Sequence, residues 1–419
     1  MKIIIVFLLA NFVVNPLFAQ HSAKESFSVA MAAGDSLPEN YEAPLQVLRG
    51  IPVDHQDPFG KSMWLQAMMT YHSFAGNYDS TLYYADARYG VNLDTLSIRM
   101  DTSFMLTYQA VDAAEYLTRL ASRHQVTMLN EAHHIPSHRA FLIGLLKGFK
   151  DAGYRYLAIE TLQDSLINQS RNVGYHTGYY SREPLFAEAM RYALKMGYQL
   201  VPYESQIECD NAKSDRNYCN SFRDSVMAVN LSKVMIDDPT AKMLVFAGYD
   251  HIHKGNANGW KKMAEYFQDI TGIEPLSVDQ AIHSEHYYPQ FGTKEFSAVN
   301  QSLNILRPVV AVKGADIWHG RFVDVSVIHP HYRKDRTRRP FFYELNGLRK
   351  SFDLSSLALG EGRIVQAYYE NEAPGKRIPA DQIGGAEVNR VLYLFPGRYE
   401  LVIKSPDGKL LDRRSVKVE

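Results

Sequence analysis

The chain has 419 residues, of which 45 are basic and 46 acidic, and its formal net charge at pH 7 is −1. A balance this even creates no field that would attract phosphate groups, which disfavours a nucleic-acid partner. The length exceeds the roughly 250–300 residues that one hydrophobic core usually organises, so the sequence predicts two or three domains.

The first residues have the pattern of a secretory signal peptide. Lys2 supplies a positive start, residues 3–14 are apolar, and the small residue Ala19 stands at a suitable cleavage position. The apolar run is shorter than the roughly 20 residues that a transmembrane helix needs, although an uncleaved N-terminal anchor is the alternative. No other stretch is long and apolar enough to cross a membrane. We therefore expect a signal peptide over residues 1–19 and an exported protein, periplasmic or extracellular, whose mature form has no membrane span.

Residues 20–102 are expected to form a polar segment followed by a helical cap. Residues 20–40 are polar, which predicts loose order. Apolar side chains in residues 64–71 and 82–85 recur at helical spacing, and Gly76 with Asn77 breaks the pattern. This predicts a helical hairpin packed on the main domain. A single such unit cannot form a solenoid, which needs about three repeats.

Residues 103–296 alternate between helical and extended patterns. Alternation of this kind is typical of parallel βαβ units, so this part is predicted to be an α/β domain with a parallel sheet flanked by helices. The expected helices cover residues 108–123, 137–152, 184–196, 221–236 and 259–271, and the expected strands cover residues 125–129, 154–159, 198–203, 241–248 and 273–278.

Residues 297–419 are predicted to form a β-rich module. Short extended segments with turn signals between them are typical of a β-sandwich. The expected strands cover residues 308–312, 322–328, 340–343, 363–369, 391–395, 399–404 and 410–418.

The chain has two cysteines, Cys209 and Cys219. In an oxidising compartment they could close a small loop through a disulfide, and two buried thiols are the alternative. Their spacing, with no further cysteine or paired histidine nearby, argues against a zinc site.

Ionisable residues follow four successive strands of the predicted parallel sheet. Ligands bind at the carboxyl ends of such strands, because loops and helix N-termini gather there. The sequence therefore predicts a functional cleft at this edge of the sheet, and its candidate residues are Glu131, His133, His134, Glu160, Tyr203, Glu204, His251 and His253.

These residue types allow two kinds of chemistry. His133 could act as a general base oriented by Glu131, with Glu160 and Glu204 orienting water and His251 as a second acid or base. The alternative is a divalent metal ion held by His133, Glu160 and His251.

Other residues are expected to contact the substrate or to border the cleft. Tyr203, Glu204, His134 and His253 are the substrate-binding candidates. His134 and His138 share one face of the following helix and are placed at the rim. No Gly-x-Ser-x-Gly motif is present, which disfavours a serine hydrolase of the usual α/β type.

Three segments resemble a known superfamily. The segments LNEAH (residues 129–133) and YLAIE (residues 156–160) look like signatures of the erythromycin-esterase-like and ChaN-like families. The segment VFAGYDH (residues 245–251) resembles the late element of the ChaN-like, TraB-like and TIKI proteins. The resemblance covers roughly residues 125–278. It implies that His133 is the general base, that Glu131 and Glu160 are the accompanying acids, and that His251 is the late histidine; one departure is Asn130, where the families have glycine.

The resemblance implies two functions for the core domain. TIKI-like members imply a metal-dependent peptidase, and ChaN-like members imply an association with haem. The leading expectation is an exported hydrolase for a small-molecule or peptide substrate, with a divalent metal ion as a cofactor candidate. The alternatives are a protein that binds haem or another iron compound, and a structural surface protein.

Overall fold

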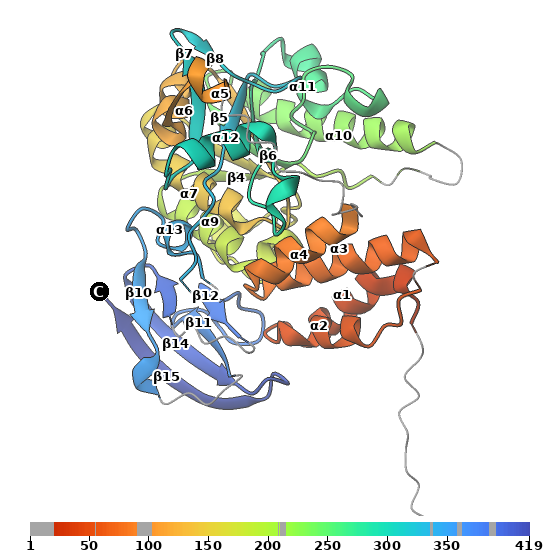
Figure 1. Ribbon diagram of the computed structural model, residues 1–419, viewed down its shortest axis with the longest axis vertical. Helices are drawn as coiled ribbons and strands as arrows, with labels where there is room; N and C mark the ends of the chain where they lie inside the picture. The colour runs from red at the N-terminus through yellow and green to blue at the C-terminus, as the bar shows by residue number, and fades with distance from the viewer. Residues whose placement is uncertain are drawn as a thin grey trace, which may run out of the picture.

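The computed structural model describes residues 21–54, 56–89, 103–207, 209, 215–335, 338–357, 363–384 and 391–419. The expected signal peptide lies outside the described residues. Figure 1 shows the α/β part above, with the C-terminal sheets at the lower left and the N-terminal helices at the lower right. Among the described residues, no helix combines the length and the apolar character needed to cross a membrane.

A nine-stranded mixed sheet forms the centre of the molecule, in the order β1-β7-β9-β6-β2-β5-β3-β4 with β8 paired to β7. The strands from β9 to β4 are parallel, and β1, β7 and β8 add antiparallel strands at one edge. The parallel strands are β2 (Val126–Glu131), β3 (Tyr156–Ile159), β4 (Gln199–Pro202), β5 (Met243–Gly248), β6 (Leu276–His283) and β9 (Val325–Ile328). The edge strands are β1 (Gln109–Asp112), β7 (Val309–Lys313) and β8 (Asp316–Ile317). The parallel α/β architecture predicted from the alternation is therefore confirmed.

Helices cover both faces of this sheet, and β2, β5 and β9 are buried on both sides, as parallel strands usually are. In β5, Leu244 and Phe246 pack with α7 (Pro136–Asp151) and α9 (Pro184–Lys195) in one core cluster. Met243 and Val245 point the other way and pack with α10 (Arg216–Asp237) and α11 (Met263–Thr271). The remaining helices of this part are α5 (Ser103–Thr107), α6 (Ala113–Ala121), α8 (Ile167–Ser170) and α12 (Lys294–Ser302).

Four N-terminal helices form the cap: α1 (Ser26–Ser36), α2 (Glu42–Arg49), α3 (Pro58–Phe74) and α4 (Tyr78–Tyr89). α3 and α4 make the helical hairpin, and Gly76 between them has a φ of +80°, which glycine adopts readily. The expectation of loose order for residues 20–40 is wrong, because α1 lies within them. Ala30 is fully buried and packs with Tyr71 and Phe74 of α3, so tertiary contacts order this segment.

Two antiparallel sheets form the C-terminal module. The first contains β10 (Lys350–Asp353) and β13 (Val391–Leu394), and the second contains β11 (Ile364–Tyr369), β12 (Asp381–Ile383), β14 (Gly397–Lys404) and β15 (Leu410–Val418). Leu392 and Leu394 of the first sheet share a core with Val365 and Leu401 of the second. The β-rich character predicted for this region is thus confirmed, and the two sheets pack as a small sandwich.

Three segments differ from the sequence-based expectation. The strands expected over residues 308–312 and 322–328 are β7 and β9, and they join the central sheet rather than the C-terminal module. Residues Pro340–Tyr343, expected as a strand, form the short helix α13, because Pro340 suits the first turn of a helix. The helix expected from residue 108 begins at Ala113, since residues 109–112 pair with β7 and Asp112 caps the helix.

Candidate functional site

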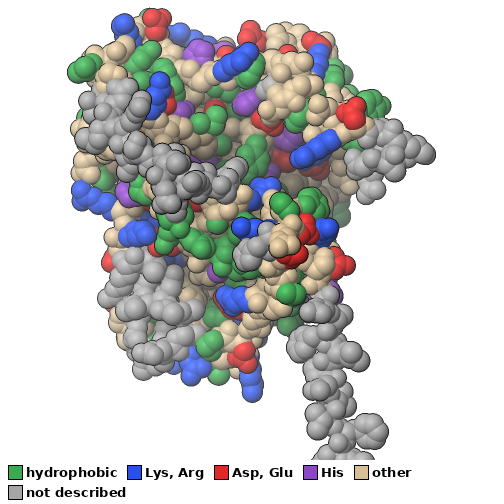
Figure 2. Space-filling view, turned by 45° about the vertical axis from the view of Figure 1, so that its right-hand side comes forward, with side chains coloured by type: hydrophobic (Ala, Val, Ile, Leu, Met, Phe, Trp, Pro, Cys, Tyr) green, Lys and Arg blue, Asp and Glu red, His purple; other side chains and the backbone are tan. Residues whose placement is uncertain are grey.

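The carboxyl ends of β2, β3 and β5 bring the candidate residues together. Glu131 is the last residue of β2, and Glu160 follows directly after β3. β5 lies between these two strands, and His251 follows in the turn after it. Figure 2 shows histidine and acidic side chains gathered in a hollow of one face of the molecule.

His133 is oriented by a buried acid. Its Nδ1 lies 2.9 Å from Oε1 of Glu131. Arg139 of α7 donates to both oxygens of Glu131, over 2.8 and 3.2 Å. Burial raises the pKa of the Glu131 carboxyl, but Arg139 and His133 outweigh burial and lower it overall. An ionised Glu131 can only accept hydrogen bonds, so Nδ1 of His133 carries a proton and Nε2 is the nitrogen available to act as a base.

His251 is held in the same way from another element. Its Nδ1 is hydrogen-bonded to Oδ1 of Asp224 in α10, and Oδ2 of this aspartate accepts from Nε1 of Trp260 over 3.0 Å. Burial lowers the pKa of His251, but Glu160 and Asp224 outweigh burial, so the pKa lies above its ordinary value. The two histidines are therefore two separate acid–histidine pairs.

Glu160 stands between these two pairs. The Nε2 atoms of His133 and His251 each lie 3.8 Å from its Oε1. Its Oε2 accepts a hydrogen bond from the backbone N–H of Gly248. Burial raises the pKa of Glu160, but His251, His133, Arg223 and this N–H together lower it to about 2. Glu160 is therefore ionised at neutral pH.

Arg223 connects Glu160 to Glu204. Its Nη2 donates to Oε1 of Glu160 over 2.8 Å, and its Nη1 lies 3.0 Å from Nε2 of His251. Glu204 accepts from Nε and Nη2 over 2.9 and 2.5 Å. The Arg223 side chain is 39 % exposed, whereas that of Glu160 is 5 % exposed. A fixed positive charge thus lies on the solvent side of the site.

Arg223 and Asp224 were not among the residues predicted from the sequence. Both lie inside the helix expected over residues 221–236, where charged side chains usually form the solvated face. Asp224 is nevertheless 1 % exposed. One signal was available: the helix carrying these residues follows the strand that ends before Glu204, so its first turns lie at the same edge of the sheet.

Aromatic rings and one glycine fix the position of His133. Tyr180 stacks on the imidazole at 4.1 Å between ring centroids, and Tyr249 meets it edge-on at 5.2 Å. A Cβ on Gly248 would lie 2.4 Å from the His133 ring. Tyr249 has a φ of +44°, in the left-handed region, and its N–H donates to the carbonyl of Glu131 over 2.8 Å. Strained backbone of this kind is characteristic of functional sites.

The remaining candidates lie around this group rather than in it. Tyr203 is fully buried, and its hydroxyl donates to the carbonyl of Phe246 over 2.9 Å, so the ring belongs to the core. His134 lies 3.4 Å from the Tyr249 hydroxyl, and burial lowers its pKa to about 3. His253 stacks over Phe322 at 6.0 Å.

The expected rim position of His138 is wrong. The ring is fully buried: its Nδ1 accepts from the N–H of Ala132 over 3.0 Å, and its Nε2 lies 2.7 Å from the Ser284 hydroxyl. His138 is thus a structural residue that holds the loop after β2 in place.

The donor set does not fit a divalent metal ion at His133, Glu160 and His251, which was one alternative from the sequence. Across the part of the chain that the structure describes, no group of three or more His, Cys, Asp or Glu side chains is arranged to hold one. The reason is local, because Arg223 directs N–H groups at Oε1 of Glu160 and at Nε2 of His251. The guanidinium takes the place that a cation would need. The Arg223 N–H also occupies Nε2 of His251, so this nitrogen is not free for axial ligation of haem.

The disulfide predicted as one alternative is confirmed. Cys209 and Cys219 are joined, with 5.5 Å between their Cα atoms. Cys219 lies in the first turn of α10, four residues before Arg223. The bridge therefore ties the start of this helix to the segment that follows Glu204.

Comparison with known proteins finds distant structural likenesses. No protein-family model and no curated protein matches the chain. The type III effector HopBA1 aligns at 15 % identity and a TM-score of 0.31, over 42 % of this chain and 87 % of that one. The MARTX toxin effector domain RRSP from Vibrio vulnificus aligns at 13 % identity and a TM-score of 0.31, over 62 % of this chain and 54 % of that one.

A third likeness covers more of this chain. The C-terminal region of Pasteurella multocida toxin, described as having a thiol-protease-like catalytic triad, aligns at 11 % identity and a TM-score of 0.29. The alignment covers 95 % of this chain and 61 % of that one. At such TM-scores these likenesses carry no argument about the function of this chain.

Proposed function

We propose that this protein is a hydrolase in which His133 removes a proton from the water molecule that attacks an ester or amide carbonyl. The observation that carries the proposal is the arrangement of His133 and His251 about Glu160. Each ring is oriented through Nδ1 by a buried carboxylate, and each Nε2 lies 3.8 Å from the same oxygen. A carboxylate on Nδ1 fixes the tautomer of an imidazole base and stabilises the imidazolium that forms.

The other residues have distinct roles in this mechanism. Glu160, ionised because its pKa is about 2, accepts a hydrogen bond from the attacking water and keeps it beside Nε2 of His133. The oxyanion that develops on the carbonyl accepts the second N–H of Nη1 of Arg223. The other N–H groups of Arg223 already donate to Glu204, Glu160 and His251. The imidazolium that forms on His133 returns its proton to the leaving group, and His251 accepts from Arg223 at Nε2 over 3.0 Å and so holds the guanidinium in place.

We also propose that the chain is related to the erythromycin-esterase-like, ChaN-like and TIKI superfamily and that it is exported. The three motif segments support the first proposal, because each contributes a residue to the site. The disulfide supports the second, since such bonds persist in oxidising compartments. A small molecule or a peptide is the proposed substrate.

The test is hydrolysis of a panel of nitrophenyl esters and a peptide library by the purified protein. His133→Gln is expected to lower kcat by about 10²–10⁴-fold, the usual contribution of a general base, while the circular dichroism spectrum stays unchanged. His253→Gln is the matched control, because its ring stacks on Phe322 outside the group, and it should keep its activity. Full activity in His133→Gln, or activity that a chelator abolishes and a divalent ion restores, would contradict the proposal.

A further inference from the structure

A cavity of about 240 Å³ lies at the same edge of the central sheet as the candidate site. α4 of the cap covers it, and the loop after β2 and the end of β6 form its other walls. Its apolar lining residues are Leu82, Ala85, Ala132, Ile135, Ala281 and Ile282. β6 is the neighbour of β2 on the side away from β5, so the cavity lies one strand along from the site.

The cavity and the site share a wall. Tyr249 and His134 line the cavity, and the Tyr249 ring meets the His133 ring edge-on at 5.2 Å. His134 follows His133 in the chain, and its Nδ1 lies 3.4 Å from the Tyr249 hydroxyl. Tyr249 therefore borders both the cavity and the His133 ring, so the cavity lies directly beside the site.

The charged side chains of the lining are already paired. Asp86 accepts from the N–H of Tyr288 over 2.9 Å, and its other oxygen lies 2.7 Å from Nδ1 of His286. Glu285 accepts from Nε of Arg339 over 3.0 Å. An ionic group entering the cavity would lose its hydration without gaining a free partner, which is costly. The lining thus favours an uncharged group.

The size of the cavity limits the group further. An apolar cavity of about 150 Å³ in another protein binds benzene, so about 240 Å³ admits a larger ring system or a branched aliphatic chain. At the neighbouring surface, the ring centroids of Tyr83 in α4 and Tyr287 lie 5.3 Å apart, and these residues are 40 % and 45 % exposed. Their neighbours in the chain, Leu82 and His286, line the cavity.

We infer that this cavity is a specificity pocket, which receives a bulky uncharged hydrophobic group adjacent to the bond that is cleaved. The inference rests on the proposed hydrolase function, and it names the class of substrate that such a hydrolase selects.

The first test measures binding and needs no catalysis. The probe is N-phenyl-1-naphthylamine, an uncharged aromatic compound whose fluorescence rises in an apolar site. Ala281→Phe and Ala85→Phe fill the cavity from two different elements, and each should raise the Kd by at least about tenfold. Ala87→Phe is the matched control: it places the same side chain on α4 at a position that does not line the cavity, and the Kd should stay within about twofold. 2-Naphthamide should displace the probe at lower concentration than 2-naphthoate.

The second test compares two nitrophenyl esters, an acetate and a 2-naphthoate. In the filled variants, kcat/KM for the naphthoate should fall at least about tenfold relative to that for the acetate. Probe binding that is unaffected by filling, or an unchanged ratio of the two kcat/KM values, would overturn the inference. The filled variants could lose binding of the probe while the wild-type protein cleaves no ester or peptide. In that case the hydrolase proposal is wrong, and the cavity remains a binding site for bulky uncharged hydrophobic groups.

Discussion

Each histidine of the site depends on an acid that is itself held by a further residue. Glu131 is fixed by Arg139, and Asp224 is fixed by Trp260. The Arg139 side chain is fully buried, so removing the charge of Glu131 would leave a guanidinium buried with less compensation, which is costly. The orientation of the imidazoles and the stability of the fold are therefore coupled at these residues.

Gly248→Ala tests the close packing at the proposed base. The added methyl group would lie 2.4 Å from the His133 ring and 3.0 Å from Oε2 of Glu160, so the ring must move. Because a displacement of about 1 Å can cost about 10²-fold in rate, we expect kcat to fall by about this factor. Steady-state kinetics with the best ester of the panel, together with the thermal unfolding midpoint, would measure both effects.

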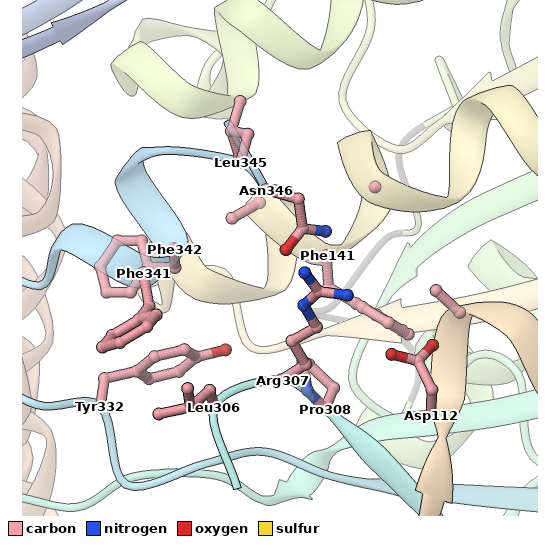
Figure 3. A pocket seen from close by; sticks show the side chains of 13 residues that line it. Asp112, Phe141, Leu306, Arg307, Pro308, Tyr332, Phe341, Phe342, Leu345 and Asn346 are labelled. Atoms are coloured by element: carbon pink, nitrogen blue, oxygen red, sulfur yellow. The ribbon is translucent and has the colours of Figure 1, made fainter. Parts of the chain in front are cut away.

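Gly144→Ala is the matched control for this substitution. Gly144 lies in α7 and borders a cavity of about 50 Å³, in which Arg307 reaches between Asn346 and Asp112 (Figure 3). Nothing lies within 4 Å of the Cβ that would be added. Alanine here should raise the unfolding free energy by about 0.5–1 kcal/mol and leave kcat unchanged. Equal activity of the two variants would contradict the proposed constraint at Gly248.

At the scale of elements, α10 determines whether the site is complete. This helix carries Arg223 and Asp224, and its first turn contains Cys219. The disulfide to Cys209 restricts where the helix can begin relative to the end of β4. Two residues of the site thus depend on the placement of one helix.

Cys219→Ser tests the contribution of this bridge. Closing so short a loop restricts the unfolded chain, so the substitution should lower the unfolding free energy by on the order of 2–3 kcal/mol. A lower kcat is expected as well, because Arg223 and Asp224 follow within five residues of Cys219. Urea denaturation with and without a reductant measures the change in unfolding free energy. The reductant should lower the urea midpoint of the wild-type protein but leave that of the variant unchanged. If the oxidised and the reduced wild-type protein unfold at the same urea concentration, the disulfide does not stabilise the fold.

At the scale of the whole molecule, buried histidines make stability depend on pH. Burial lowers the pKa of His72 to about 4 and those of His134 and His329 to about 3. The folded state therefore binds a proton at each of these histidines more weakly than the unfolded state does. The contribution of the neutral, buried histidines to the free energy of unfolding is complete above about pH 6.5, the pKa in the unfolded state. This contribution is lost as the pH falls toward the folded-state pKa values. His251 acts in the opposite sense, because its pKa is raised.

We therefore expect the free energy of unfolding to decrease as the pH falls from 7 to 5. Each of the three histidines should contribute a slope of up to about 1.4 kcal/mol per pH unit below about pH 6.5. Guanidinium denaturation at a series of pH values measures the slope. His329→Gln should reduce it, whereas His176→Gln, at a side chain that is 52 % exposed, is the control. A stability that is constant between pH 7 and 5 would contradict the expectation.

The sequence alone determined the parallel α/β core and grouped five residues of the candidate site, with Glu204 among them. Helical and extended periodicities are local, and they located β2, β3, β5 and the helices between them. The carboxyl ends of parallel neighbours must meet at one edge of the sheet, so Glu131, Glu160, Glu204 and His251 could be grouped from the sequence. His133 was found in the same way, because it follows β2 by two residues.

The tertiary structure alone decided which other side chains reach that edge. Whether Arg223 and Asp224 face the site or solvent depends on how α10 is rotated and positioned, and no local pattern encodes this rotation. β7 and β9 have the same extended pattern as the strands of the C-terminal module, yet they pair with the central sheet. Likewise, His138 is buried because Ser284, distant in sequence, lies against it. Contacts between segments far apart in the chain made these choices, because equivalent local patterns are compatible with either outcome.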